Sequence, residues 1–139
     1  PRTYVRVPDD DPARFDEGAF VSALRAGRAI VSGGPFVRLE VAGGEPGDTV
    51  ASGVLDVLVT ADAPDWIDLS SLEILVRGRV VARGTAPFEL GPHRAELRTR
   101  ISLEPGDWVV AVARGGSPMD VLFRRGVVPF AFPNPVWVR

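Results

Sequence analysis

The stretch RAELRTRISL, residues 94–103, alternates strictly in the character of its side chains. Every even position is polar or charged, and every odd position from Ala95 to Leu103 can point into a core. A period of two is typical of a half-buried strand, because successive side chains of a strand point to opposite faces. The stretch therefore predicts an antiparallel strand with one dry and one wet face.

The residues that follow predict a second strand, joined to the first by a tight turn. Pro105-Gly106 has turn composition, and DWVVAVA, residues 107–113, is apolar on both faces. Apolar character on both faces is expected of a central strand. We expect Trp108, Val110 and Val112 to lie on its core side.

Shorter alternations on the N-terminal side extend the same pattern. Residues 37–41, 55–59 and 72–76 each place apolar side chains on one face, and Arg77-Gly78-Arg79 predicts a hairpin in which glycine supplies a positive φ. Fifteen glycines and thirteen prolines stand at nearly every join. We expect a mainly β fold, an antiparallel Greek-key, immunoglobulin-like β-sandwich over residues 36–139 with one short N-terminal helix.

Residues 1–35 differ from the rest and are expected to form a connecting segment. Asp16 can cap a helix N-terminus, and Gly27 follows the last apolar turn in the position of a C-terminal glycine. The pattern predicts a helix from Asp16 to Ala26, between two short strands.

The composition excludes several kinds of chemistry. The 139 residues include no cysteine and one histidine, His93, which excludes disulfides, thiol nucleophiles and multi-histidine metal centres. Sixteen basic and eighteen acidic side chains give a net charge of −2, so no strong field attracts nucleic acid or an anionic membrane. The apolar runs are shorter than the roughly 18 residues of a membrane-spanning helix. We therefore expect neither nucleic acid nor a membrane as a partner, and the compartment stays undetermined.

Candidate metal ligands lie in one expected loop. Asp62, Asp65 and Asp68 surround Pro64 and Trp66, and such carboxylates could hold a Ca²⁺. Their spacing matches no known ligand pattern, so turn-forming aspartates are the preferred interpretation. The run of three aspartates at residues 9–11 is interpreted as a solvated connection for the same reason.

Other candidate binding residues are aromatic or basic. Trp66 and Trp137 could serve as platforms for a sugar ring, although packing at the ends of a sandwich is the commoner use. His93 has no Ser, Cys or carboxylate at motif spacing and is interpreted as a surface residue. The arginines of residues 94–100 and Arg124-Arg125 are interpreted as solvated charges. No catalytic residue is expected.

Three stretches carry a resemblance to a known family. They are RTYV (residues 2–5), ALRAGR (23–28) running into VSGGPFV (31–37), and FPNPVWV (132–138). Together they resemble the C-terminal part of PHP-domain metal-dependent hydrolases of the carbaryl hydrolase-like type. In that family a metal-binding barrel comes first and a β-sandwich follows. This chain departs from the family pattern at Gly33 and Pro133, where Asn and Thr are common.

The resemblance implies a non-catalytic accessory domain that begins just past the catalytic ligands. Residues 1–35 would dock onto an upstream PHP barrel of the same chain, and the exposed docking segment could also pair with a second copy. Divalent metal ions and the hydrolysis of phosphoester, amide or carbamate bonds would belong to the parent chain, with no cofactor in this part. The alternative is an autonomous ligand-binding module, for example for carbohydrate, with Trp66 or Trp137 as its platform and a Ca²⁺ at residues 62–68.

Overall fold

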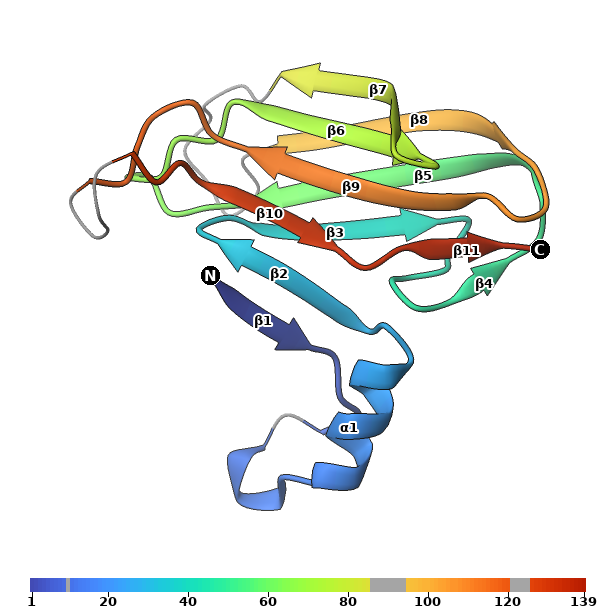
Figure 1. Cartoon of the computed structure of the whole chain (residues 1–139), viewed down its shortest axis with the longest axis horizontal. Helices are drawn as coiled ribbons and strands as arrows, with labels where there is room; N and C mark the ends of the chain where they lie inside the picture. Colours follow the sequence, from blue (N-terminus) through green and yellow to red (C-terminus); the bar gives the residue numbers. More distant parts are fainter. Residues whose placement is uncertain (10, 86–94, 121–125) are drawn as a thin grey trace.

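A computed structural model describes residues 1–9, 11–85, 95–120 and 126–139, and these form two β-sheets packed face to face (Figure 1). The fold is mainly β with one α-helix among the described residues, as predicted. The smaller sheet has the order β3 (Phe36–Val41), β5 (Gly53–Asp62), β8 (Ala95–Leu103). The larger sheet contains β1 (Arg2–Val5), β2 (Ala29–Gly33), β4 (Thr49–Val50), β6 (Ser71–Val76), β7 (Arg79–Thr85), β9 (Trp108–Arg114), β10 (Phe130–Pro133) and β11 (Val136–Val138).

The strand predicted from the strictest alternation is β8. Ala95 and Leu103 at its ends are buried, the odd positions between them are half-buried, and its even positions are exposed. β8 pairs antiparallel with β5 over its whole length, from Ala95 opposite Ala61 to Leu103 opposite Gly53. The predicted half-buried antiparallel strand is confirmed.

The larger sheet is organised around β9. One edge of β9 pairs with β6, and the other edge pairs first with β11 and then with β10, which are separated by Asn134-Pro135. β10 continues the sheet to β2, and β2 pairs with β1. Two strands from residues 1–35 therefore belong to the sandwich itself.

The core face of β9 is opposite to the one predicted. Trp108, Val110 and Val112 lie half-buried on the outer face of the sheet. Alternation could not choose between the faces, because both are apolar. The side of the strand with two alanines turns inward, which leaves room for the bulkier side chains of β3 across the core. The buried residues of β9 are Val109, Ala111 and Ala113.

The predicted hairpin joins β6 to β7. Val76 pairs with Arg79, so Arg77 and Gly78 form a two-residue loop. Arg77 has a φ of 49° and Gly78 a φ of 77°, as a type I′ turn requires. Gly78 supplies a positive φ as expected, and Arg77 adopts one as well.

Asp107 ties this hairpin to the turn between β8 and β9. Its carboxylate accepts a hydrogen bond of 2.8 Å from the Glu104 amide and pairs with the guanidinium of Arg77. The Glu104 hydrogen bond, and then Arg77, hold the pKa of Asp107 below its ordinary value, against the opposing effect of desolvation. The Asp107 carboxylate thus holds together the β6–β7 turn and the β8–β9 turn at this end of the sandwich.

Leu72→Ala should lower the free energy of unfolding by about 2–5 kcal/mol, because Leu72 is fully buried between the sheets and truncation leaves a cavity. Urea denaturation followed by circular dichroism measures the change. Val54→Ala is the matched control, since Val54 is exposed on β5 and its truncation should cost under about 0.5 kcal/mol. Equal effects of the two substitutions would contradict the assigned core.

The contribution of Asp107 should depend on pH. Its folded-state pKa lies below the unfolded value of about 3.9, so its stabilisation is present above that value and is lost as the pH falls through the lowered folded pKa. We expect Asp107→Asn to destabilise the protein at pH 6, and we expect this effect to shrink as the pH is lowered below about 3.9, as measured by urea denaturation at a series of pH values. Asp65→Asn, at an exposed turn, serves as the control. A pH-independent effect of Asp107→Asn would refute this role.

Candidate functional site

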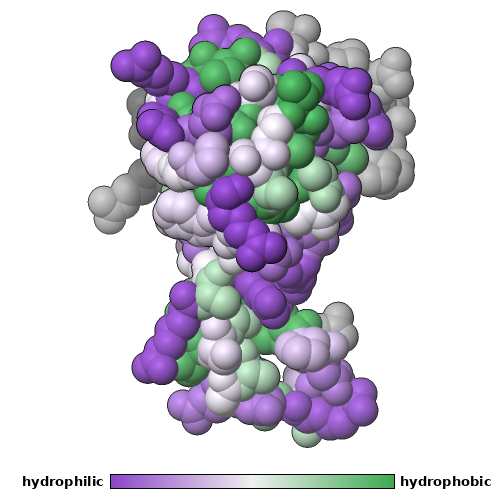
Figure 2. Space-filling view, turned by 90° about the vertical axis from the view of Figure 1, so that its right-hand side faces the viewer, coloured by the Kyte–Doolittle hydropathy of each residue, from purple (hydrophilic) through white to green (hydrophobic). Residues whose placement is uncertain are grey.

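Residues 6–28, which we call the arm, leave the larger sheet after β1 and return to it at β2. The arm contains a short 3-10 helix, η1 (Pro12–Arg14), and the α-helix α1 (Glu17–Arg25). It projects from the sandwich (Figure 1) and forms the lower lobe of the space-filling view, below a narrow waist (Figure 2).

Local hydrogen bonds build the two helical pieces of the arm. Asp11 caps η1 by accepting from the Ala13 amide at 2.9 Å, and Asp16 caps α1 by accepting from the Ala19 amide at 3.0 Å. Arg14 pairs with both Asp9 and Asp11. The predicted helix is confirmed, and these two aspartates of residues 9–11 have a structural role in the turn.

The arm exposes apolar side chains. Phe15, just before α1, is 62% exposed and contacts the ring of Phe20 at 5.7 Å between centroids. Leu24 is also exposed, and Ala23 is the buried residue of α1. Two large apolar side chains of the arm, Phe15 and Leu24, are therefore exposed, whereas Phe20 and Val21 of α1 are half-buried.

A close backbone contact fixes the base of the arm. Gly47, between β3 and β4, has a φ of +91°, and a Cβ there would lie 2.2 Å from the carbonyl oxygen of Ala26. Its amide donates to the carbonyl of Pro135 at 2.9 Å. A side chain at position 47 would push the returning arm away from the sandwich, so glycine is required on both conformational and steric grounds.

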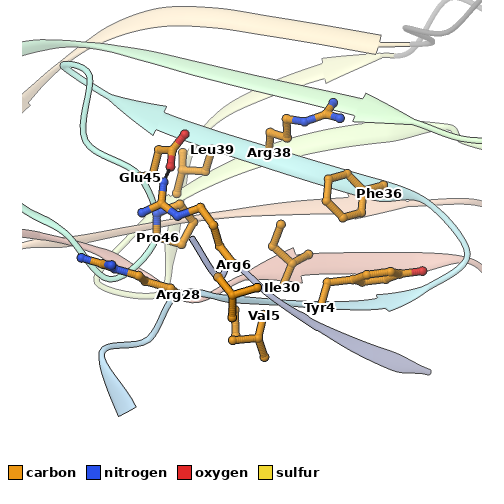
Figure 3. A pocket seen from close by; sticks show the side chains of 12 residues that line it. Tyr4, Val5, Arg6, Arg28, Ile30, Phe36, Arg38, Leu39, Glu45 and Pro46 are labelled. Atoms are coloured by element: carbon orange, nitrogen blue, oxygen red, sulfur yellow. Dashed lines mark ion pairs between the residues drawn. The ribbon is translucent and has the colours of Figure 1, made fainter. Parts of the chain in front are cut away.

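A pocket of about 420 Å³ lies at this junction, where β1 and β2 face β3 (Figure 3). Its volume falls within the range of roughly 300–1,000 Å³ that is usual for small-molecule sites. The lining is largely apolar and comes from both the arm and the sandwich. We call it the arm pocket; its residues include Tyr4, Val5, Arg6, Val7, Arg28, Ile30, Phe36, Arg38, Leu39, Glu45 and Pro46.

The two ends of the arm pocket differ in chemistry. Arg28 and Arg6 lie at one end, where Arg6 pairs with Glu45, and Tyr4 and Phe36 lie at the other (Figure 3). The rings of Tyr4 and Phe36 meet edge to face, 5.3 Å apart and at 86°. The site thus has Arg6 and Arg28 at one end, and two aromatic rings with Arg38 beside Phe36 at the other.

The arginines of the arm pocket are not equally compensated. Arg6 pairs with Glu45 and lies 3.9 Å from Asp48. Arg38 pairs with Asp62, and its guanidinium lies 5.0 Å from the centroid of Phe36. Arg28 is exposed and forms no ion pair within the part of the chain that the structure describes. One positive charge at the pocket is left without a counter-charge.

The two candidate sugar platforms are exposed but separate. Trp66 is 60% exposed in the loop after β5, and Trp137 is 47% exposed on β11. Trp137 pairs with Trp108 at the start of β9, whereas the loop of Trp66 contacts Gly116, beyond the end of β9, through Asp68. Because Trp137 lies beside the start of β9 and the loop of Trp66 lies beyond its end, the two residues cannot form one platform.

The candidate metal-binding aspartates of residues 62–68 do not share one site, because their side chains make different contacts. Asp68 accepts hydrogen bonds of 2.7 Å from the amides of Gly116 and Ser117, and so fixes the loop after β9. Asp62 pairs with Arg38, and Asp65 is exposed. Across the described ranges, no three histidine or carboxylate side chains gather so that they could hold a metal ion.

The remaining basic candidates divide between described and undescribed residues. Arg98 pairs with Glu96 at 3.5 Å, and Arg100 pairs with Asp56 at 2.9 Å, so the wet face of β8 is charge-compensated. His93, Arg94 and Arg124-Arg125 lie outside the described residues.

The outer face of the larger sheet is an apolar surface that the alternation did not predict. It carries Trp108, Val110, Val112, Leu75, Phe132 and Trp137. The buried carboxylate of Glu73 lies among them and accepts from Arg83 Nε at 2.9 Å, with Arg114 Nε 3.8 Å away. This charge is neutralised within the face, which makes the surface a candidate for protein contact.

Sequence reasoning also missed the arm pocket. Tyr4 and Arg28 are far in sequence from Phe36 and Glu45, and only the pairing of β1 with β2 brings them to one place. The available signal was Arg28, a charged residue directly before the apolar residues of β2.

Gly47→Ala should destabilise the protein more than Gly43→Ala. Both glycines have a positive φ, which costs an alanine about 1–2 kcal/mol, but position 43 is open, whereas position 47 is filled by Ala26. Urea denaturation measures the two free energies, and amide exchange in residues 23–29 should accelerate in the Gly47 variant alone. Equal behaviour of the two variants would show that the contact does not fix the arm.

No family model, curated protein or solved structure matches the chain. Within the described residues, no helix has the length and apolar character needed to cross a bilayer.

Proposed function

We propose that this chain is a non-catalytic accessory β-sandwich from the C-terminal part of a PHP-type metal-dependent hydrolase. Its arm, together with β1, would dock onto the catalytic barrel of the parent protein. The family resemblance at residues 2–5, 23–37 and 132–138 supports this proposal. Two of these stretches lie at the base of the arm, and the third forms β10 and β11 beside it.

The observation that carries the proposal is the exposed apolar surface of the arm. Phe15 is 62% exposed and Leu24 is 45% exposed. The arm that carries them projects from the sandwich (Figure 2). Leaving such side chains in water forfeits roughly 1.5–3 kcal/mol each relative to burial. A segment of this kind is stabilised when another folded surface covers it.

The residue inventory supports a structural role. With one histidine and no cysteine in 139 residues, the chain cannot supply the many histidine and carboxylate ligands of a PHP centre. The divalent metal ions, and the hydrolysis of phosphoester, amide or carbamate bonds, would belong to the barrel. The sandwich would cover barrel surface, position loops at the rim of the active site, or hold subunits together.

A carbohydrate-binding module is the second candidate, because both Trp66 and Trp137 are exposed. Their separation limits each to a single-ring contact, and aromatic contacts of that size contribute about 0.5–1.5 kcal/mol beyond their buried area. Sugar binding at Trp66 or Trp137 does not explain why the chain carries the arm. The accessory-domain proposal accounts for both the arm and the resemblance.

The coding sequence upstream of Pro1 should encode several hundred residues with clustered His and Asp ligands. In the full-length protein, Phe15→Ser combined with Leu24→Ser should make the junction at least about tenfold more sensitive to limited proteolysis, because the docked apolar contacts are lost. Val54→Ser, an exposed substitution on β5, is the control and should leave the cleavage rate unchanged.

Two results would overturn the proposal. One is a start codon or a signal peptide immediately upstream of Pro1. The other is turnover of a phosphoester, amide or carbamate substrate by this chain alone with Mn²⁺ or Zn²⁺, above a metal-free control.

A further inference from the structure

The arm pocket has the features of a binding site independent of any docking by the arm. It is walled by β1 and the start of β2 on one side and by β3 and the loop after it on the other. The Arg6–Glu45 ion pair spans the two sides. The cavity is therefore part of the folded chain itself.

Apolar side chains lie between the two chemically different ends of the arm pocket. Figure 3 shows Ile30 and Val5 between the arginine end and the aromatic end. Tyr4 is 43% exposed, so its ring offers surface to an incoming group. A flat apolar ligand can lie along this floor and meet an aromatic ring at its far end.

The charge at the pocket favours a monoanion. The lining contains three arginines and one carboxylate, and Arg6 and Arg38 already have carboxylate partners. Arg28 remains, and a guanidinium binds a carboxylate through two parallel hydrogen bonds. A neutral ligand would leave the positive charge of Arg28 without a counter-charge, and a dianion would carry more negative charge than Arg28 can balance.

We propose that the arm pocket binds a small aromatic carboxylate, with its carboxylate on Arg28 and its ring against Tyr4 and Ile30. Arg6 lies beside this anion site and remains paired with Glu45. Because the lining belongs to both sides of the junction, the bound ligand also bridges the arm and the sandwich.

The test uses the purified chain and three probes: 2-naphthoate, its neutral analogue 2-naphthamide, and acetate. Binding is followed by ¹H–¹⁵N shift changes at residues 4–7 and 28–30. We expect saturable binding of 2-naphthoate, at least about tenfold weaker binding of 2-naphthamide, and none of acetate, since charge and ring are both needed.

Matched substitutions separate the two contacts. Arg28→Gln should weaken 2-naphthoate at least about tenfold and leave 2-naphthamide unchanged, because it removes only the charge partner. Arg25→Gln, an exposed arginine of α1 outside the pocket, should change neither. Tyr4→Ala should weaken both naphthyl probes, and thermal melts verify that each variant is folded.

The proposal is overturned if 2-naphthoate does not saturate below about 5 mM, which corresponds to a binding free energy of about 3 kcal/mol. It is equally overturned if Arg28→Gln behaves like Arg25→Gln, or if the shift changes map to Trp66 or Trp137 instead. None of these outcomes depends on an upstream barrel, so failure here and failure of the docking proposal are distinguishable.

Discussion

Position 47 admits only glycine, and the features that suggest a function depend on this one backbone contact. The carbonyl of Ala26 occupies the space that a side chain would need. Because the loop between β3 and β4 can approach this closely, the chain returns from the arm directly into β2, which pairs with β10. The same approach places Glu45 beside Arg6 and closes one end of the arm pocket. The base of the arm and one end of the pocket thus depend on the same close contact.

Charge pairing distinguishes Arg28 from the other two arginines of the arm pocket. Arg38, Arg83 and Arg100 each have a carboxylate partner on a neighbouring strand. Exposed pairs of this kind add about 0–1 kcal/mol of stability, and their main effect is to leave little net field. Among the described residues, Arg28 forms no ion pair, and the same is true of the exposed Arg2, Arg25, Arg79 and Arg139, but of these five only Arg28 lines the arm pocket. An uncompensated guanidinium beside apolar surface is a better guide to binding than the arginine content of the chain.

The sequence predicted those elements in which one residue pattern has one structural meaning. The strict alternation of residues 95–103 predicted β8, the Asp16 and Gly27 pair predicted α1, and Arg77-Gly78 predicted a hairpin turn. It chose the wrong core face for β9, because an apolar strand carries no information about its orientation until the facing sheet is known. The arm pocket was beyond reach for a related reason. Its walls come from segments that only strand pairing brings together.

The arm links the two proposals physically. Its exposed Phe15 and Leu24 provide the surface proposed for a partner domain, and its base provides part of the pocket wall. A ligand that bridges arm and sandwich restricts the position of the arm, and a partner that holds the arm restricts the width of the pocket. Coupling of this kind is reciprocal, because the free energy that one event contributes to the other is the same in both directions. If the arm docks onto a catalytic barrel, occupancy of the pocket is therefore coupled to how the sandwich is seated at the rim of the active site.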